Sequence, residues 1–150
     1  MYNTCLRIIG DDQEAEDIMQ ESFFKAFDKI LTYKNEVSFG AWLKRIVVNS
    51  SIDALKKRKL NFTQLEEAYM LVDEATENSN YSEESISALK DAIEKLPEGY
   101  RLVLNLYAIE EYDHEEIAQM LGITTSTSRS QLARAKQKLI EIIRNNPKDK

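Results

Sequence analysis

The sequence predicts an all-α fold made of two small helical domains. Only 4 Gly and 2 Pro occur in 150 residues, whereas Leu, Ile, Ala, Glu and Lys, which are common in helices, are abundant. Apolar residues make up 43% of the chain, which is enough to bury a core. Alternating Val, Thr and Tyr segments bounded by turn pairs, which would indicate strands, are not evident in the sequence.

A polar segment divides the chain into two helical modules. The stretch ATENSNYSEES, residues 75–85, is acidic and almost free of large apolar side chains, as is typical of a linker. The change in composition begins near residue 61. We therefore expect an N-terminal module at 1–60, an acidic flexible linker at 61–85 and a C-terminal module at 86–146.

The charge pattern points to two contacts with a polyanion. The chain has a net charge of −6, but residues 44–59 contain six basic residues and one acid, and residues 124–150 contain seven basic residues and two acids. Residues 61–100 contain ten acids and two lysines. Two basic segments that flank an acidic one favour nucleic-acid binding, because local rather than total charge steers association. On charge alone, ordinary solvated helix faces would explain the pattern equally well.

The N-terminal module begins with an abbreviated helix. The segment YNTCLRIIG is typical of the last turns of a helix that ends at Gly10 in a left-handed cap. Because this helix has almost no beginning, we expect that the chain is a shortened version of a longer protein. The single Cys5 is interpreted as a small core residue in a reducing compartment. No apolar run reaches the roughly 18 residues that would span a bilayer.

The next predicted helix starts with Asp11 and Glu14 spaced as in a capping box and continues to about Ile30. Spacing of 3.6 residues predicts one buried stripe, formed by Ala15, Met19, Ser22, Phe23, Ala26 and Ile30. The opposite side, here called the acidic face, carries Asp17, Gln20, Glu21, Phe24 and Asp28. Its aromatic residue is either an isolated surface side chain or part of a docking face for a basic partner helix.

A loop over residues 31–37 precedes a helix that Ser38 is expected to cap and that runs to about Arg58. Two sides of this helix are apolar. A third side, here called the mixed strip, carries Trp42, Arg45, Asn49, Asp53 and Lys56. An aromatic ring, cations and an amide in line suit stacking on bases, phosphate contact and base-edge hydrogen bonds. Alternatively, Trp42 belongs to the core and the cations only solubilise the helix.

The C-terminal module contains a helix-turn-helix pattern. A helix over 85–96 stops at Pro97, which we place in the first turn of the next helix. Asp113 and Glu116 are spaced as a capping box for a helix that Gly122 ends, and Thr124 is expected to cap the last helix. A short helix, a glycine turn and a longer helix favour DNA binding, although a plain helical hairpin would share these features.

The last helix has a buried side and an outer side. The buried stripe is predicted to hold Leu132, Ala135, Leu139 and Ile143, and the outer side Ser126, Thr127, Ser130, Ala133, Arg134 and Gln137, with Arg129 at the flank. Small hydroxyls at a helix N-terminus let the backbone approach phosphate, and an arginine further along can reach guanine. Ser128 points inward, where we expect it to bond to the Thr124 carbonyl. His114, the only histidine, is expected to decorate the surface.

Taken together, these motifs resemble bacterial RNA polymerase sigma factors of the small extracytoplasmic-function (ECF) type, in the sigma-70 family. The segment EAEDIMQESFFKAFDKI resembles region 2.2 of that family, and FGAWLKRIVVNSSIDALKKRK resembles regions 2.3 and 2.4. The segment LPEGYRLVLNLYAIEEYDHEEIAQMLGITTSTSRSQLARAKQKL resembles region 4. The resemblance covers nearly the whole chain, although Ser126 stands where the family commonly has glycine.

The resemblance implies roles for particular residues. Docking on the β′ clamp helices of RNA polymerase is implied for Asp17, Gln20, Glu21 and Phe24. Capture of a flipped base and contact with the −10 element and melted strand are implied for Tyr33, Lys34, Asn35, Trp42, Arg45, Asn49 and Lys56. Contact with the −35 element in the major groove is implied for Ser126, Thr127, Arg129, Ser130 and Arg134.

The resemblance further implies a cytoplasmic promoter-specificity subunit that binds core polymerase, including the β flap, recognises both promoter elements and assists melting. An anti-sigma factor is a possible separate partner, and no cofactor or membrane insertion is expected. The alternative is a conventional helix-turn-helix regulator with an N-terminal sensing or dimerisation domain. An enzyme is disfavoured, because the sequence shows no Cys/His metal set, Gly-rich phosphate loop or Ser-His-Asp set.

Overall fold

The computed structural model describes residues 1–57 and 83–145. Within these ranges every regular element is helical, which confirms the all-α prediction. The described residues form two compact units that divide between the two ranges, and each unit is considered by itself. No helix in the described ranges is both long and apolar enough to cross a membrane.

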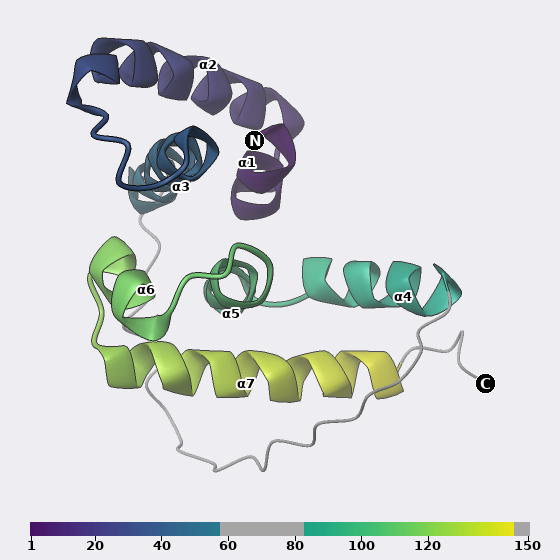
Figure 1. Ribbon diagram of the computed structural model, residues 1–150. Coiled ribbons are helices and arrows are strands. Elements are labelled where there is room, and N and C mark those ends of the chain that lie inside the picture. The colour runs from purple at the N-terminus through teal and green to yellow at the C-terminus, as the bar shows by residue number, and fades with distance from the viewer. Residues whose placement is uncertain (58–82, 146–150) are drawn as a thin grey trace. The chain divides into compact units, whose positions relative to one another are not determined.

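The N-terminal unit consists of α1 (Tyr2–Ile9), α2 (Asp12–Asp28), the 3-10 turn η1 (Ile30–Thr32) and α3 (Phe39–Lys57). Each of the three α-helices packs against the other two (Figure 1). Gly10 ends α1 with φ 80° and donates its N–H to the Leu6 carbonyl at 2.8 Å, as the sequence predicted. Asp11 caps α2 by accepting the Glu14 N–H at 2.9 Å. This connection turns the chain back so that α1 and α2 both lie against α3.

Polar groups of small size lie inside this core. Cys5 is fully buried, with Sγ 3.2 Å from Ser51 Oγ and 3.5 Å from the Ala15 carbonyl. Burial raises the pKa of the Cys5 thiol, so the group stays protonated and behaves as a small core residue, which confirms that expectation. The remaining core is aliphatic and includes Ile8, Val47, Val48, Ile52 and Leu55.

The buried side of α2 differs from the predicted stripe. Ala15, Ser22 and Ala26 are buried as expected, but Phe23 and Ile30 are exposed by 40% and 43%, and Ile18 is buried instead. The stripe was therefore wrong for Phe23 and Ile30. Apart from Ile18, the buried residues of α2 are the small side chains of Ala15, Ser22 and Ala26. Ile30 lies beyond the end of α2, in η1, and so departs from the helical periodicity.

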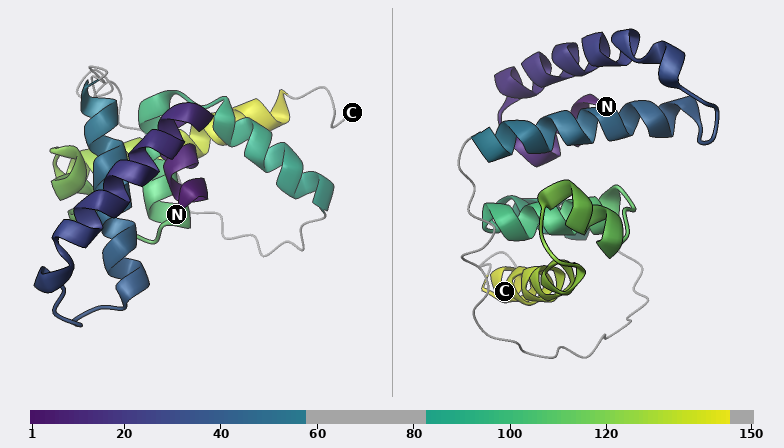
Figure 2. Two further views of the ribbon diagram at one scale, coloured as in Figure 1. Left: turned by 90° about the horizontal axis from the view of Figure 1, so that it is seen from above. Right: turned by 90° about the vertical axis from the view of Figure 1, so that its left-hand side faces the viewer.

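The C-terminal unit consists of α4 (Glu83–Glu94), α5 (Glu98–Leu104), the π turn η3 (Asn105–Ile109), α6 (His114–Leu121) and α7 (Thr125–Arg144). The long helix α7 lies along one side, and α4, α5 and α6 pack against it (Figure 1; Figure 2). The core of this unit includes Leu102, Val103, Ile117, Leu121, Leu132 and Ala135 of these helices and Leu106 of η3. The buried residues of α7 therefore lie between Ser128 and Ala135.

Two local details refine the expectations for this unit. Pro97 is the N-cap of α5 rather than a residue of its first turn, and its carbonyl accepts the Arg101 N–H at 2.9 Å. The helix that begins after Pro97 changes to a π turn at Asn105, where the Glu110 N–H bonds to the Asn105 carbonyl at 3.0 Å. The helix α4 includes residues 83–85 of the expected linker, and the rest of that linker lies outside the described residues.

Candidate functional site

The turn between α6 and α7 is fixed by hydrogen bonds at both helix ends. Asp113 Oδ1 accepts the Glu116 N–H at 2.8 Å, and Glu116 Oε2 accepts the Asp113 N–H at 3.0 Å, which completes the predicted capping box. Gly122 has φ 68° and donates its N–H to the Ala118 carbonyl. Thr124 Oγ1 accepts the Thr127 N–H at 3.0 Å. These caps define the angle at which α7 leaves the turn.

The predicted −35 residues all lie in the N-terminal half of α7, and we call them the reading surface: Ser126, Thr127, Arg129, Ser130 and Arg134. Ser126 and Arg129 are exposed, and the other three are half-buried. Two hydroxyls already have partners within the helix end: Ser130 Oγ donates to the Ser126 carbonyl at 3.0 Å, and Thr127 Oγ1 lies 2.8 Å from Thr124 Oγ1. The structure brings all five residues onto one helix, with the small hydroxyl residues nearest its N-terminus.

His114 and Ser128 join α6 to α7 beside the reading surface. Ser128 is fully buried, and its Oγ lies 2.8 Å from His114 Nδ1. The His114 ring stacks on Tyr107 of η3, with centroids 4.6 Å apart and planes at 19°. Two expectations were therefore wrong. The serine hydroxyl meets the imidazole rather than the Thr124 carbonyl, and the histidine is half-buried rather than a surface decoration.

The electrostatic surroundings of His114 favour its neutral form. Burial lowers the pKa of His114, Arg129 lowers the pKa further, Asp113 opposes the decrease, and Lys136 adds to it. The sequence did contain one signal of this contact, namely a serine at a buried position of α7. The partner could not be identified because it lies fourteen residues away, on another helix.

The acidic face of α2 is exposed along its length, as predicted. Asp17, Gln20, Glu21 and Phe24 are all exposed, and 70% of Phe24 is accessible. Exposed apolar side chains continue toward η1, and sequence reasoning did not identify them as a group: Phe27 is 73% exposed and Leu31 96%. An apolar surface of this kind rimmed by acids is typical of a protein-binding site.

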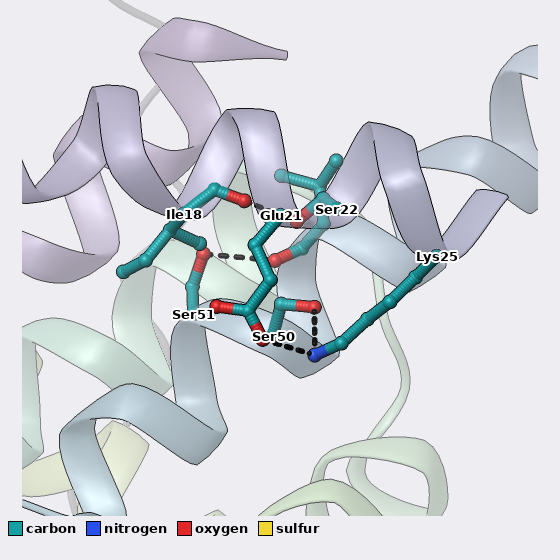
Figure 3. A network of polar contacts seen from close by, with 7 residues as sticks. Ile18, Glu21, Ser22, Lys25, Ser50 and Ser51 are labelled. Atoms are coloured by element: carbon teal, nitrogen blue, oxygen red, sulfur yellow. Dashed lines mark hydrogen bonds and ion pairs between the residues drawn. The ribbon is translucent and has the colours of Figure 1, made fainter. Parts of the chain in front are cut away.

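One residue of the acidic face is also tied to α3. Lys25 Nζ lies 2.9 Å from Glu21 Oε1 and donates to Ser50 Oγ at 3.3 Å (Figure 3). The hydrogen bond from Lys25 holds the pKa of Glu21 below its ordinary value. Nearby, Ser22 Oγ donates to the Ile18 carbonyl at 2.6 Å and Ser51 Oγ to the Val47 carbonyl at 2.8 Å. Lys25 therefore links Glu21 of the acidic face to Ser50 of α3.

The loop before α3 is organised by a cluster of three rings. The Tyr33 ring lies 5.3 Å from Trp42 and 5.7 Å from Phe39, and Phe39 lies 5.6 Å from Trp42, all between centroids. Tyr33 also donates its hydroxyl to the Val37 carbonyl at 2.6 Å. Asn35 has φ 56°, a conformation that asparagine tolerates better than most residues. Trp42 therefore joins the loop to the start of α3 and is half-buried rather than part of the main core.

The mixed strip continues from this cluster along α3. Arg45, Asn49, Asp53 and Lys56 are all exposed, and their spacing of three and four residues places them on one side of the helix. Ser38 Oγ accepts the Ala41 N–H at 3.2 Å and so caps α3 as predicted. The N-terminal unit therefore places a cluster of rings at the start of α3, and exposed cations, an amide and one acid further along the same helix.

Comparison with known proteins identifies both units. A family model described as Sigma-70 region 2 matches residues 1–60, and one described as Sigma-70, region 4 matches residues 86–139. Together these matches cover more than half of the chain.

Individual relatives agree with the family models. The chain is 30% identical over 156 residues to the ECF RNA polymerase sigma factor SigW of Bacillus subtilis, covering 97% of this chain and 83% of SigW. It is 32% identical to the ECF RNA polymerase sigma factor SigE of Mycolicibacterium smegmatis, over 93% of this chain and 55% of SigE. Its fold is similar to the sigma factor RpoE solved with the anti-sigma factor NepR from Bartonella quintana, with a TM-score of 0.63, 21% identity and coverage of 97% and 90% of the two chains.

Proposed function

The chain belongs to the sigma-70 family, in the ECF group of RNA polymerase sigma factors, and on this premise we propose how its two units divide the recognition of a promoter. As a promoter-specificity subunit it binds core RNA polymerase, recognises the −10 and −35 elements and assists melting of the DNA. A self-sufficient helix-turn-helix regulator is not favoured, because the N-terminal unit matches a sigma region rather than a sensing or dimerisation domain.

The C-terminal unit reads the −35 element with α7. The reading surface begins at the capped N-terminus of α7, where exposed N–H groups and the helix dipole favour a phosphate. Arg129 and Arg134 follow at one and two turns, a distance from which a guanidinium can reach base edges in the major groove. The observation that supports this role most strongly is the fixed α6–α7 turn, since a base-reading helix must leave it at a defined angle.

The N-terminal unit recognises the −10 element with its loop and α3. In this proposal Tyr33, Lys34 and Asn35 receive a flipped base, Trp42 supports the opened strand, and Arg45, Asn49 and Lys56 contact the DNA backbone and base edges. Capture of an unstacked base offsets part of the few kcal/mol that unstacking costs, so melting needs no catalytic residue. The three-ring cluster supports this role because it holds the loop on the helix that carries the mixed strip.

The acidic face of α2 docks on polymerase. Asp17, Gln20, Glu21 and Phe24 are exposed together, which suits a partner helix on β′ that carries basic and apolar residues. The C-terminal unit is assigned to the β flap. In this proposal the sigma regions extend over 1–60 and 86–146 and a linker joins them over 61–85.

Further assignments follow from the same family membership. We place the chain in the cytoplasm, where core polymerase transcribes the bacterial chromosome, and we assign it no enzymatic activity and no cofactor. The fold shared with a sigma factor solved in complex with an anti-sigma factor supports a separate inhibitory protein as a further partner.

The direct test is transcription by purified core polymerase on a promoter library, with and without this protein. We expect the protein to select promoters that share two elements, one upstream and one at the melted segment. Transcripts identical in the two reactions would refute the proposed function. Recovery of a single upstream element with no requirement for core polymerase would instead favour a self-sufficient regulator.

A further inference from the structure

His114 and Ser128 form a polar contact between α6 and α7. It connects the first residue of α6 to the first turns of α7, next to Arg129 of the reading surface. Hydroxyl and imidazole are 2.8 Å apart, and Tyr107 covers one face of the ring. The imidazole is therefore held in a fixed orientation against the helix that we assign to promoter recognition.

This contact is compatible with both protonation states of the imidazole. In one neutral tautomer Nδ1 accepts a hydrogen bond from the Ser128 hydroxyl, and in the other Nδ1–H donates one to Ser128 Oγ. An imidazolium also donates from Nδ1–H to Ser128 Oγ. Protonation therefore leaves the contact in place and adds a positive charge at the junction of α6 and α7.

We propose that His114 is a DNA-linked proton site, at which the chain takes up a proton when α7 engages promoter DNA. This inference depends on the proposed role of the reading surface. It assigns to His114 a positioning role through Ser128 and an electrostatic role in affinity, neither of which requires the imidazole to touch a base.

The groups around His114 explain why DNA would change its protonation. In the free chain burial contributes most to the lowered pKa of His114, and Arg129 of α7 lowers that pKa further. Asp113, at the start of the same helix as His114, opposes the decrease, and Lys136 of α7 adds to it. From η3 the ring meets Tyr107, which contributes an aromatic face. DNA phosphates bound against α7 would screen the charges of Arg129 and Lys136 and would also attract the positively charged imidazolium of His114. The imidazolium is therefore more stable in the DNA-bound state than in the free state.

The sign of the linkage follows from this difference. Since the pKa of His114 is higher in the DNA-bound state than in the free state, the protonated chain binds more tightly. The gain in affinity is fully present below the free-state pKa and is lost as the pH rises through the bound-state pKa. A pKa increase of about 0.5 to 1 unit corresponds to a gain of about three- to tenfold in affinity at low pH.

The first measurement uses the full-length chain and proton NMR. Because His114 is the only histidine in the sequence, its ring signals report one pKa without assignment. The pKa is measured with and without a saturating concentration of a duplex that carries the −35 element of a promoter selected from the library, so that a contact too weak to select promoters without polymerase is still populated. We expect DNA to raise it, and to raise it less in Ser128→Ala, where the ring loses its anchor. An unchanged or lower pKa in the presence of bound duplex would overturn the proposal, and so would an undiminished increase in Ser128→Ala.

The second measurement compares the polymerase complexes of wild-type and His114→Asn chains on the selected promoter between about pH 5.5 and 8. The asparagine amide keeps a donor near the position of Nδ1 but does not titrate, and the ratio of the two affinities cancels any pH dependence of the polymerase. We expect the ratio to favour the wild type by about three- to tenfold more at the acidic end. A ratio that is constant with pH would show that His114 is only structural.

The two measurements separate this inference from the assignment of the reading surface. Promoter binding that is intact in the wild type, together with no proton uptake, refutes the proton linkage alone. Absence of any contact between α7 and the selected promoter refutes the assignment of the reading surface and the proton linkage with it.

Discussion

Replacement of Gly122 by alanine tests the turn between α6 and α7. The same replacement should have opposite effects on stability at Gly122 and at Gly40. Gly122 adopts φ 68°, and an added Cβ would meet no atom within 4 Å. The cost of Gly122→Ala is therefore conformational, about 1–2 kcal/mol for an alanine in the left-handed region. Gly40 lies in α3 without a positive φ, and its Cβ position is also open. Gly40→Ala should stabilise the N-terminal unit by up to about 1 kcal/mol.

Hydrogen exchange and fluorescence can follow the two units separately. Exchange of the α6 and α7 amides should become about five- to thirtyfold faster in Gly122→Ala, as expected for a loss of 1–2 kcal/mol. Trp42, the only tryptophan, reports urea unfolding of the N-terminal unit, and its midpoint should rise only in Gly40→Ala. Unchanged exchange in Gly122→Ala, or stabilisation by it, would refute the argument that a left-handed glycine sets this turn.

Three further outcomes follow from the proposed surfaces and the core. Arg134→Ala should reduce discrimination at one −35 position by about 1–3 kcal/mol in promoter binding assays. The control variant Lys138→Ala should leave that discrimination unchanged. An equal loss of affinity on every sequence would make Arg134 a phosphate contact. Asp17→Ala should weaken binding to core polymerase in a pull-down titration. Glu16→Ala, which removes a neighbouring exposed acid, is the control. Equal binding by the two variants would remove Asp17 from the docking face. Cys5 should resist alkylation at pH 8 until urea unfolds the N-terminal unit, because the thiol is buried and burial raises its pKa. Rapid alkylation of Cys5 in the folded chain would contradict its place in the core.

Features determined by neighbouring residues could be predicted from the sequence. The left-handed ends at Gly10 and Gly122 and the caps at Asp113 and Thr124 depend on a few adjacent side chains, and the structure contains all four. The helical content and the exposure of the acidic face follow in the same way from periodicity. The roles of the individual site residues remain predictions, although their places on α2, α3 and α7 are compatible with those roles.

Features determined by distant contacts could not be predicted. Periodicity assigned Phe23 to the core, but Ile18 and the small residues Ala15, Ser22 and Ala26 are the buried residues of α2. Which of two neighbouring positions faces the partner helix depends on the packing of both helices, and the pattern of one helix does not determine it. The His114–Ser128 contact crosses a turn between two helices, and the three-ring cluster joins a loop to α3. The sequence marked Ser128 as a polar residue in a buried position, which is the trace that such a contact leaves in a single chain.

In the proposed function, one chain attached to core polymerase reads a promoter at two places with two different units. The most direct measurement is the affinity of the polymerase complex for a selected promoter and for derivatives in which either element is scrambled, made with wild-type, Arg134→Ala and Trp42→Ala chains. We predict that Arg134→Ala reduces the loss of affinity caused by scrambling the −35 element and leaves the effect of scrambling the −10 element unchanged, and that Trp42→Ala does the reverse. A complex that fails to form, or two variants that lose sensitivity to the same element, would contradict the account.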